Sequence, residues 1–589
     1  MTVAHDNRPA APPAGKKWSW DEAAPWLAAM VALLGRLPAL GAYWNQDDWG
    51  LLAGASGLAG APTSALRWLS RVAYWDLMWP LAGLDPHPYA WTRLALHAAA
   101  AAGTVKLGRR LGYSGLQAAV AGLIMAATPL AFTALYWAAG VQDLLAVAAA
   151  VWALVLWCDR GPWRTGGAIA LAVVAVASKE TLVGLPLVMA AAAWLGPAAR
   201  RGPRGLAPLA VTAAAAAVAA GLALRGFDTS DLQPYELGGP LDMLRHLLVY
   251  GWWLLQPGPA YTTDPIVAMA AAGGALWLGW FAWGWSRRRQ GRPADLLVWL
   301  AALITVAPLL PLLRHLAPDL AYPVEPFGAL ALGGLVPRRL DRRPWLLGVA
   351  AVLAGAWGFL GMEGRLALRD PDGLPADPVV RRTAVSWQVA RQLPRLPIGE
   401  AGLVIVQPPL ARETARMALA LGEDWVTGSD AYHSLGGALG PRLLLGPDVP
   451  VRWTNGLRFV PEGSFVLFDA GGELKPWGFL DQALLYQALT DVGLGHFERA
   501  RLHLLRAGLL GGDTLTLIFD PGLLPVGLDQ VLANKVAFID HLAAGLQQGR
   551  SPFEVGGVQT NFFRLLSACT GIDEATLRAD GGPSGKATP

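Results

Sequence analysis

The sequence is poor in charged residues and almost free of cysteine. Of its 589 residues only 15% are Asp, Glu, Lys or Arg, which is too few for a wholly water-soluble chain of this length. Its two cysteines, Cys158 and Cys569, lie far apart and have no metal-ligand spacing. The sequence therefore predicts neither a disulfide framework nor a zinc site.

Periodic and disordered architectures are also excluded. Gly (69) and Pro (45) are numerous but have no three-residue repeat, and apolar runs dominate the first part of the chain. Hydrophobic residues make up 54% of the total, and the mean hydropathy is +0.37. The net charge of +4 comes from short basic clusters between apolar runs rather than from one basic face. This pattern is typical of a membrane protein and predicts no nucleic-acid partner.

The apolar runs predict about eleven transmembrane helices, since a bilayer core of about 30 Å takes roughly 20 residues per helix. The first run, Ala23–Trp44, has no convincing signal-peptide cleavage site after it, so we expect it to be retained and to follow a cytoplasmic tail over residues 1–22. The predicted spans occupy residues 24–43, 88–106, 114–135, 138–157, 165–178, 181–195, 206–224, 265–285, 294–313, 320–336 and 344–361.

Charge predicts the direction of these spans, because Lys and Arg accumulate in short cytoplasmic loops. The basic clusters at 106–110, 160–164, 200–204, 287–292 and 338–343 fall on one side only if the N-terminus is cytoplasmic and residues 165–195 form a helical hairpin that turns at Ser178-Lys179-Glu180. A single tilted helix over 165–195 is the alternative, and it would place three Arg-rich loops outside. We therefore expect a multi-pass protein of a bacterial plasma (inner) membrane with an extracytoplasmic C-terminal domain.

Segments outside these spans have a different pattern. Residues 64–81 and 241–256 combine helical apolar spacing with several Trp and predict helices in the membrane interface, with the Trp in an aromatic belt or stacked on a ligand. Short strands such as Leu403–Val406 and Phe465–Phe468 predict a soluble α/β domain over 365–578. Within it, 484–507 resembles one tetratricopeptide-type helix pair, and the tail at 579–589 is expected to be disordered.

Polar residues gather at the outward ends of the predicted spans. The first outward loop contains Asp47 and Asp48, and each later outward turn contributes acids or cations. A transporter would place such groups near the bilayer midplane. The economical interpretation is one site at the outer face, which would draw on Arg93, His97, Gln142, Asp143, Lys179, Glu180, Arg314, His315, Asp319, Tyr322 and Glu325.

The order of these motifs resembles the membrane region of GT-C fold glycosyltransferases, especially the protein O-mannosyltransferase-like and TMTC-like branches. The resemblance rests on PLAFTALYWAAGVQDLL at 129–145, the Ser178-Lys179-Glu180 turn and the acidic pair at 47–48, with further likeness at 93–97 and 314–327. It covers roughly residues 24–361. It implies a GT-C-like fold and a sugar donor carried on a polyprenyl phosphate.

Such a transfer needs a base for the acceptor hydroxyl and a cation for the leaving phosphate. Asp47 or Asp48 is the candidate general base, in a reaction with inversion. Lys179, Arg314 and His315 are the candidate phosphate-binding residues. Supporting or acceptor-binding roles fall to Arg93, His97, Gln142, Asp143, Glu180, Tyr322 and Glu325.

Alternatives remain open at each position. Asp47 and Asp48 also suit a solvated turn or a helix cap, Lys179 suits an ion pair with Glu180, and Asp143 and Glu325 suit helix capping. No cofactor is required, although paired acids can hold a divalent cation. The expected partners are the lipid-linked sugar, membrane lipid and an acceptor protein or glycan. The alternative function is a non-enzymatic membrane transport or assembly protein whose soluble domain docks a partner.

Overall fold

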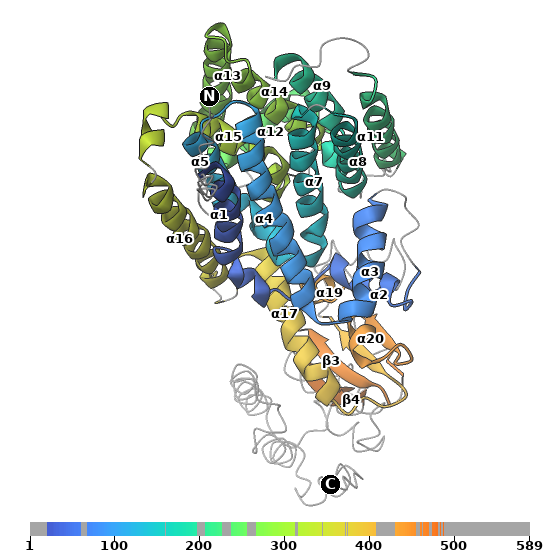
Figure 1. Cartoon of the computed structure of the whole chain (residues 1–589). Helices are drawn as coiled ribbons and strands as arrows, with labels where there is room; N and C mark the ends of the chain where they lie inside the picture. The colour runs from blue at the N-terminus through green and yellow to red at the C-terminus, as the bar shows by residue number, and fades with distance from the viewer. Residues whose placement is uncertain are drawn as a thin grey trace, which may run out of the picture. The chain divides into compact units, whose positions relative to one another are not determined.

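The computed structural model divides the chain into two compact units, Met1–Thr383 and Ala384–Pro589 (Figure 1). The structure describes residues 20–60, 67–159, 161–196, 206–225, 237–255, 267–312, 316–343, 345–370 and 375–407, then 430–454, 463–469 and 474–480, and single positions 373, 460, 461, 483, 484 and 487.

The first unit is helical. Its α-helices are α1 (Trp20–Leu34), α2 (Asp47–Ala55), α3 (Tyr74–Ala82), α4 (Pro86–Arg110), α5 (Gly115–Ala127), α6 (Phe132–Tyr136), α7 (Val141–Cys158), α8 (Pro162–Ser178), α9 (Leu185–Leu195), α11 (Leu209–Arg225), α12 (Pro240–Leu255), α13 (Val267–Arg289), α14 (Ala294–Val306), α15 (Glu325–Gly334) and α16 (Trp345–Ala367). Short 3-10 turns lie between them: η1 (Leu37–Gly41), η3 (Pro129–Ala131), η4 (Ala138–Gly140), η5 (Glu180–Leu182), η6 (Ala307–Leu309), η7 (Pro318–Val324) and η8 (Arg338–Arg342). The π-turn η2 (Leu69–Ala73) precedes α3.

The helices coincide with the predicted spans, but eleven spans are not confirmed. Within the described ranges, three helical segments are both long and apolar enough to cross a membrane: Gly115–Tyr136, Ala138–Cys158 and Trp345–Ala367. Shorter apolar helices occupy Glu22–Leu34, Pro162–Ser178, Glu180–Leu195, Leu209–Ala223 and Ala294–Leu309. Some of the other runs form short helices: α1, for example, ends at Leu34, and the apolar sequence continues as the separate turn η1. Helices α4 and α13 are long, but α4 contains His87, Arg93, His97 and Lys106, and α13 ends in three arginines.

Arg36 holds one of these breaks in place. This buried side chain donates hydrogen bonds to the carbonyl oxygens of Ala126 (3.4 Å), Thr128 (2.5 Å) and Gly358 (3.1 Å). It thereby ties the end of α1 to the last turn of α5 and to α16. Carbonyls at a helix end have no partner within the helix, and a guanidinium satisfies several at once. The break between α5 and α6 is therefore stabilised by Arg36, a residue that belongs to neither helix.

The chain reverses between α8 and α9, in agreement with the predicted helical hairpin. The end of α8 lies beside the start of α7, because Lys179 contacts Asp143. The start of α8 lies beside the other end of α7, where Arg164 pairs with Asp159. Trp157, near that same end of α7, donates to the carbonyl of Met189 in α9 (2.8 Å). Helix α9 thus runs back alongside α7, and a single continuous helix over 165–195 is wrong.

The basic residues that the structure describes at the ends of α4 and α13 and at the start of α8 lie at one end of the helical unit. Arg110 and Arg164 both pair with Asp159, at 3.0 and 2.7 Å, and Arg287 lies 3.2 Å from Asp295. The hydroxyl of Tyr113 donates to the same Asp295. These contacts join the ends of α4, α7 and α13 to the starts of α8 and α14. The candidate site residues lie at the opposite ends of α4, α7 and α8.

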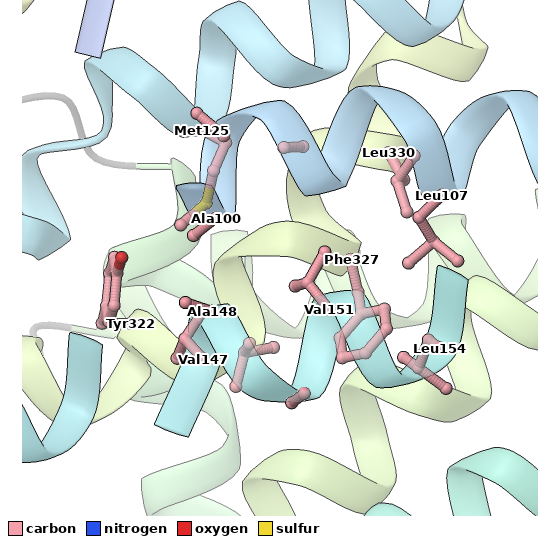
Figure 2. Close-up of a cluster of buried hydrophobic side chains, with 14 of the residues drawn as sticks. Ala100, Leu107, Met125, Val147, Ala148, Val151, Leu154, Tyr322, Phe327 and Leu330 are labelled. Carbon is pink, nitrogen blue, oxygen red and sulfur yellow. The ribbon is translucent and has the colours of Figure 1, made fainter. Parts of the chain in front are cut away.

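Close packing of small and branched side chains forms the core of the unit. Helices α1, α4, α7, α8 and α11 lie side by side (Figure 1), and α5 and α15 pack against α4. Figure 2 shows Leu107 of α4, Val151 and Leu154 of α7 and Leu330 of α15 in one buried cluster, with Tyr322 at its edge. Tyr322 belongs to the turn that precedes α15. The packed core therefore holds in place the backbone at the end of the unit where the candidate site residues lie.

The second unit contains the predicted α/β elements. Its strands are β1 (Leu403–Val406), β2 (Val451–Thr454), β3 (Phe465–Asp469) and β4 (Leu474–Phe479), in the order β2-β1-β3-β4. Strand β1 is parallel to β2 and β3, and β4 is antiparallel to β3. Helices α17 (Pro378–Gln392), α19 (Asp430–Ser434) and α20 (Leu439–Leu445) and the turn η9 (Leu393–Arg395) accompany the sheet. The boundary between the two units falls after Thr383, within α17.

Several sequence predictions fall outside the described residues. They are most of the N-terminal tail, the first part of the 64–81 helix, the helix pair at 484–507 apart from position 484 and one later position, the tail at 579–589, and both Arg314 and His315. The remaining part of 64–81 forms η2 and α3, and the second predicted interfacial segment forms α12. Their position relative to a membrane stays a prediction.

Candidate functional site

The acidic pair begins α2, and its two members have different surroundings. The carboxylate of Asp48 is fully buried, and it accepts hydrogen bonds from the main-chain N–H groups of Asn45 (3.0 Å) and Ala139 (2.7 Å). Asp47, one residue earlier on the same turn, is exposed. Asp48 thus joins α2 to the turn η4. Of the two carboxylates, only that of Asp47 is exposed to solvent.

Burial also changes the acidity of Asp48, which lies in the connection between α1 and α4. Loss of hydration raises the pKa of its carboxyl group from 3.8 to about 7. The two main-chain hydrogen bonds and the nearby charge of Arg93 act in the opposite direction but do not cancel the effect of burial. The carboxyl group of Asp48 therefore titrates near neutral pH and is inaccessible to solvent.

Lys179 stands where α8 ends. The helix stops at Ser178, and Lys179 takes an extended backbone conformation before the turn η5. Its ammonium lies 3.0 Å from a carboxylate oxygen of Asp143, in the first turn of α7, and both side chains are about seven-eighths buried, with 12% and 13% exposed. The alternative pairing of Lys179 with Glu180 is thus not the one found. The second oxygen of Asp143 has no hydrogen-bond partner among the described residues.

Glu180 pairs instead with Arg67, which sequence reasoning did not single out. The guanidinium of Arg67 contacts both carboxylate oxygens of Glu180 and lies 3.3 Å from the amide oxygen of Gln142. Arg67 has a φ of +57°, a left-handed conformation that non-glycine residues rarely adopt. The two-pronged ion pair with Glu180 anchors the side chain of this residue. No local pattern marks Arg67, since its partners lie far along the chain.

The π-turn η2 adds a further cation to this group. Ser70 donates to the carbonyl of Ser178 (2.7 Å), which joins the turn to the end of α8. Arg71 follows, and its Nε is buried without a hydrogen-bond partner among the residues that the structure describes. Single π-turns within helices are frequent at functional sites. The sequence alone did not single out Arg71 as a site residue.

A second group of predicted residues lies within the helices at the same end. His97 Nδ1 lies 3.0 Å from the hydroxyl of Tyr322, and its Nε2 lies 3.1 Å from the carbonyl oxygen of Ala126. Arg93, one turn earlier on α4, donates from Nε to the carbonyl of Leu135 (2.9 Å). All of these side chains are buried. They support the helix breaks around α6 and are not open to a substrate.

The two groups meet around η7 and the start of α15. Asp319 lies within electrostatic range of Asp143 and Lys179. Tyr322 lies within such range of both Asp143 and Glu325. Tyr322 thus lies between the ion pair of Lys179 with Asp143 and the carboxyl group of Glu325, and a shared role for these residues stays a prediction. The predicted partners Arg314 and His315 fall outside the described residues.

Glu325 faces an apolar cavity of about 530 Å³. Helices α5, α12, α15 and α16 line this cavity, and Thr128 contributes a hydroxyl group beside Glu325. Every other lining residue is apolar or aromatic. The cavity therefore has one polar end, formed by Thr128 and Glu325, and a long hydrophobic wall.

The described residues contain no group of three or more His, Cys, Asp or Glu side chains that could hold a metal ion. What the site does contain is an exposed carboxylate, cations held by acids and an adjoining apolar cavity. A carboxylate can accept a proton, and cations can stabilise negative charge on a leaving group. This combination suits group transfer at the end of a helical bundle.

Comparison with known proteins adds little to this geometry. No protein-family model matches the chain, and no curated protein matches it. Among solved structures, an oligosaccharyltransferase of Archaeoglobus fulgidus, tethered to an acceptor peptide, is similar over 72% of this chain, with a TM-score of 0.39 and 13% identity. The chain covers 63% of that protein, less than two thirds of its length. The likeness is too distant to assign a family or an activity.

Proposed function

We propose that the chain is a membrane glycosyltransferase that moves a sugar from a polyprenyl-phosphate donor to an acceptor hydroxyl. The observation that carries the proposal is that α2, which begins with the exposed Asp47, packs against η2 and η4, the turns next to the ion pairs of Lys179 with Asp143 and of Arg67 with Glu180. These groups come from three parts of the chain: the connection between α1 and α4, the start of α7, and the turn between α8 and α9. Contacts of Asp48 with Ala139, and of Ser70 with Ser178, hold these connections together.

Asp47 is the general base in this proposal. Its carboxylate takes the proton of the acceptor hydroxyl while the acceptor oxygen attacks the anomeric carbon from the side opposite the phosphate. The bond between that carbon and the phosphate oxygen breaks, and polyprenyl phosphate leaves with the bonding pair. The configuration at the anomeric carbon is therefore inverted. Asp48 has a positioning role, because both of its oxygens accept main-chain hydrogen bonds.

Lys179 and the neighbouring arginines stabilise the leaving phosphate. Lys179 keeps its ammonium beside Asp143 in the resting protein, and Arg71 follows Ser70, whose hydroxyl donates to the carbonyl of Ser178. Cations that are already oriented by acids need little reorganisation when negative charge develops. Arg314 and His315 stay candidates for the same role.

The test compares three single substitutions in purified protein given a polyprenyl-phosphate sugar and a pool of hydroxyl acceptors. Asp47→Asn should lower the transfer rate at least 100-fold, because a positioned base contributes 10²–10⁴-fold. Asp76→Asn is the matched control, since Asp76 is an exposed acid on α3 in the same connection. Its rate should equal that of the unmodified chain.

Two outcomes would contradict the proposal. Unchanged transfer by Asp47→Asn would remove Asp47 as the base. Failure of the unmodified chain to bind the donor at all would favour the alternative, a non-enzymatic membrane transport or assembly protein. Asp48→Asn should lower transfer less than Asp47→Asn and should also lower thermal stability, because Asp48 holds two connections together.

A further inference from the structure

A second apolar cavity lies between α12, α13 and α15. Its volume is about 270 Å³, and none of its lining residues carries a charge. Along α15 it extends from Gly328 to Leu335, a length of about 10 Å at 1.5 Å per residue. Its walls on α13 include Gly279, Trp280 and Trp283. We call it the α13 cavity.

The α13 cavity borders exposed apolar surface. Leu335, which lines it, is 59% exposed, and Leu278, beside Gly279 on α13, is 72% exposed. A Cβ atom added at Gly279 would meet no atom within 4 Å, so this wall leaves room for another molecule. Exposed apolar surface of this kind marks contact with lipid or with another apolar ligand. The cavity therefore suits the acyl chain of a bilayer lipid.

Arginines follow the cavity on both of these helices. On α13, Trp283 and Arg287 lie one turn apart on one face, about 6 Å along the axis at 1.5 Å per residue. After α15, Arg338 comes three residues beyond Leu335, at the start of η8. The chain thus places cations just beyond the same end of the cavity.

Contacts between the segments hold these two arginine groups close together. A Cβ atom added at Gly334 would lie 2.8 Å from the ring of Tyr113 and 3.0 Å from the ring of Trp283, so the three residues pack against one another. Arg338 donates to the carbonyl oxygen of Gly112 (3.0 Å), next to Tyr113. The end of α13 and the turn η8 therefore flank one end of the cavity.

Two acids lie among these arginines in the sequence, and both already have partners. Asp295 pairs with Arg287 and Arg292, at 3.2 and 3.6 Å. Asp341 accepts a hydrogen bond from the hydroxyl of Ser114 (2.8 Å). Arginines outnumber acids here, so this end of the cavity carries positive charge.

Arg288 and Arg289 present that charge at the surface. Both are exposed, and their guanidinium carbons lie 5.4 and 5.8 Å from the ring centre of Trp285, which is itself 41% exposed. Tryptophan and arginine are typical of the level of the lipid head groups. The phosphate of an anionic lipid would pair with these guanidinium groups. A zwitterionic lipid would bring a cation of its own beside them.

We propose that the α13 cavity binds an anionic phospholipid, with one acyl chain in the cavity and the phosphate beside Arg288 and Arg289. The positive-inside rule predicts that this lipid belongs to the cytoplasmic leaflet. The arginine end is opposite the candidate site, so the bound lipid joins α12, α13 and α15 and takes no part in sugar transfer. The inference does not rest on the proposed function.

The experiment measures lipid binding to the purified full-length chain in detergent by native mass spectrometry. The probes are dioleoylphosphatidylglycerol, which is anionic, and dioleoylphosphatidylcholine, which has the same chains and no net charge. We expect the anionic lipid to bind at least tenfold more tightly, because each arginine beside an anionic lipid contributes about fivefold in affinity, equivalent to about 1 kcal/mol. This preference should shrink as salt is added.

One pair of double variants tests the head-group contact. Arg288→Gln with Arg289→Gln should reduce the preference to less than about threefold, while both lipids still bind. Arg391→Gln with Arg395→Gln is the matched control and should keep the full preference. Both of its positions are exposed, and Arg391 also lies over a Trp ring, that of Trp387, at 5.8 Å.

A second pair tests the acyl-chain contact. Gly279→Phe should fill the cavity and weaken the binding of both lipids about tenfold. Gly221→Phe on α11 should not, because a Cβ atom at Gly221 also meets nothing within 4 Å but this residue does not line the cavity. The two variants should melt at the same temperature without added lipid. Only Gly221→Phe should then be stabilised by dioleoylphosphatidylglycerol as the unmodified chain is.

Four results would overturn the inference. They are equal binding of the two lipids, a full preference in the Arg288→Gln and Arg289→Gln chain, equal lipid binding by Gly279→Phe and Gly221→Phe, and displacement of the anionic lipid by an equal concentration of glycerol phosphate. The last would show a phosphate site in which the cavity has no part. Sugar transfer by a chain without any lipid preference would refute this inference and leave the proposed function standing.

Discussion

Two adjacent aspartates at the start of α2 show how much a single residue step changes chemistry. Asp47 is exposed, while Asp48 is fully buried and accepts two main-chain hydrogen bonds. Successive residues of a helix point in directions about 100° apart, so the two carboxylates cannot share one environment. The proposed reaction uses this difference. One acid meets the substrate and the other holds the loop that carries it.

The raised pKa of Asp48 predicts a pH-dependent stability. The folded chain holds the Asp48 proton up to about pH 7, whereas the unfolded chain releases it near 3.8. The folded state therefore loses stability as the pH rises through this window, and the full cost is present above pH 7. Asp48→Asn lacks this titration. Its melting temperature, measured relative to that of the unmodified chain in the same detergent, should increase between pH 5 and pH 8.

The control for this measurement is Asp47→Asn, which should follow the unmodified chain at both pH values because Asp47 is exposed. The absolute stability of Asp48→Asn is not the test, since an amide loses one acceptor oxygen. The test is how the difference in melting temperature between Asp48→Asn and the unmodified chain changes from pH 5 to pH 8. Parallel curves for Asp48→Asn and the unmodified chain would show that the buried carboxyl titrates normally.

At the scale of elements, the site depends on interrupted helices. The segment from α5 to α7 contains the turns η3 and η4, and it is η4 that offers the Ala139 N–H to Asp48. The end of α8 offers Lys179 because the helix stops there. Regular helices would satisfy these main-chain groups internally. The breaks therefore make them available to side chains from other segments.

Gly140 makes one of these breaks possible. A Cβ atom at this position would lie 2.5 Å from Cα and 2.6 Å from the carbonyl oxygen of Ala134, and neither backbone atom can move freely. Gly140→Ala should shift η4 and its neighbour Ala139 away from Asp48. We expect a loss of about 1–3 kcal/mol of stability, measured as a lower melting temperature, together with reduced sugar transfer.

Gly348→Ala is the matched control on α16. A Cβ atom there meets nothing within 4 Å, so the added methyl group should leave stability equal or increase it by up to about 1 kcal/mol. If Gly140→Ala and Gly348→Ala melt at the same temperature, the close approach of η4 to α6 is not a constraint on this fold.

At the scale of the whole molecule, the helical unit has two chemically different ends. Arginines that pair with Asp159 and Asp295 mark one end, and the candidate site marks the other. The positive-inside rule predicts that the arginine end is cytoplasmic. The candidate site would then face the opposite side of the membrane, where a lipid-linked sugar and its acceptor would have to meet.

Cysteine labelling in intact cells tests this orientation. In a chain with Cys158→Ala and Cys569→Ser, Asp76→Cys should react with a membrane-impermeant maleimide before permeabilisation. Arg289→Cys should react only afterwards. Both positions are exposed, so accessibility within the protein does not separate them. The reverse labelling order would place the candidate site in the cytoplasm and contradict the predicted topology.

The sequence by itself determined where helices lie, that 165–195 turns at Lys179, and that the strands at 403–406 and 465–468 belong to a separate unit. These features are local, because apolar periodicity and clusters of Lys and Arg depend on residues near one another in the chain. It also predicted that most of the candidate site residues lie at one end of the spans, because the direction of each span decides which of its ends faces outward.

Only the tertiary structure decided which groups pair and which remain accessible. Lys179 pairs with Asp143 and not with its neighbour Glu180, Arg67 joins the site, and Asp48 is closed while Asp47 is open. The apolar cavity beside Glu325 exists only where α5, α12, α15 and α16 meet. Such contacts connect segments that are distant in sequence. They depend on how the helices pack and on where each one breaks, and no local pattern of residues contains that information.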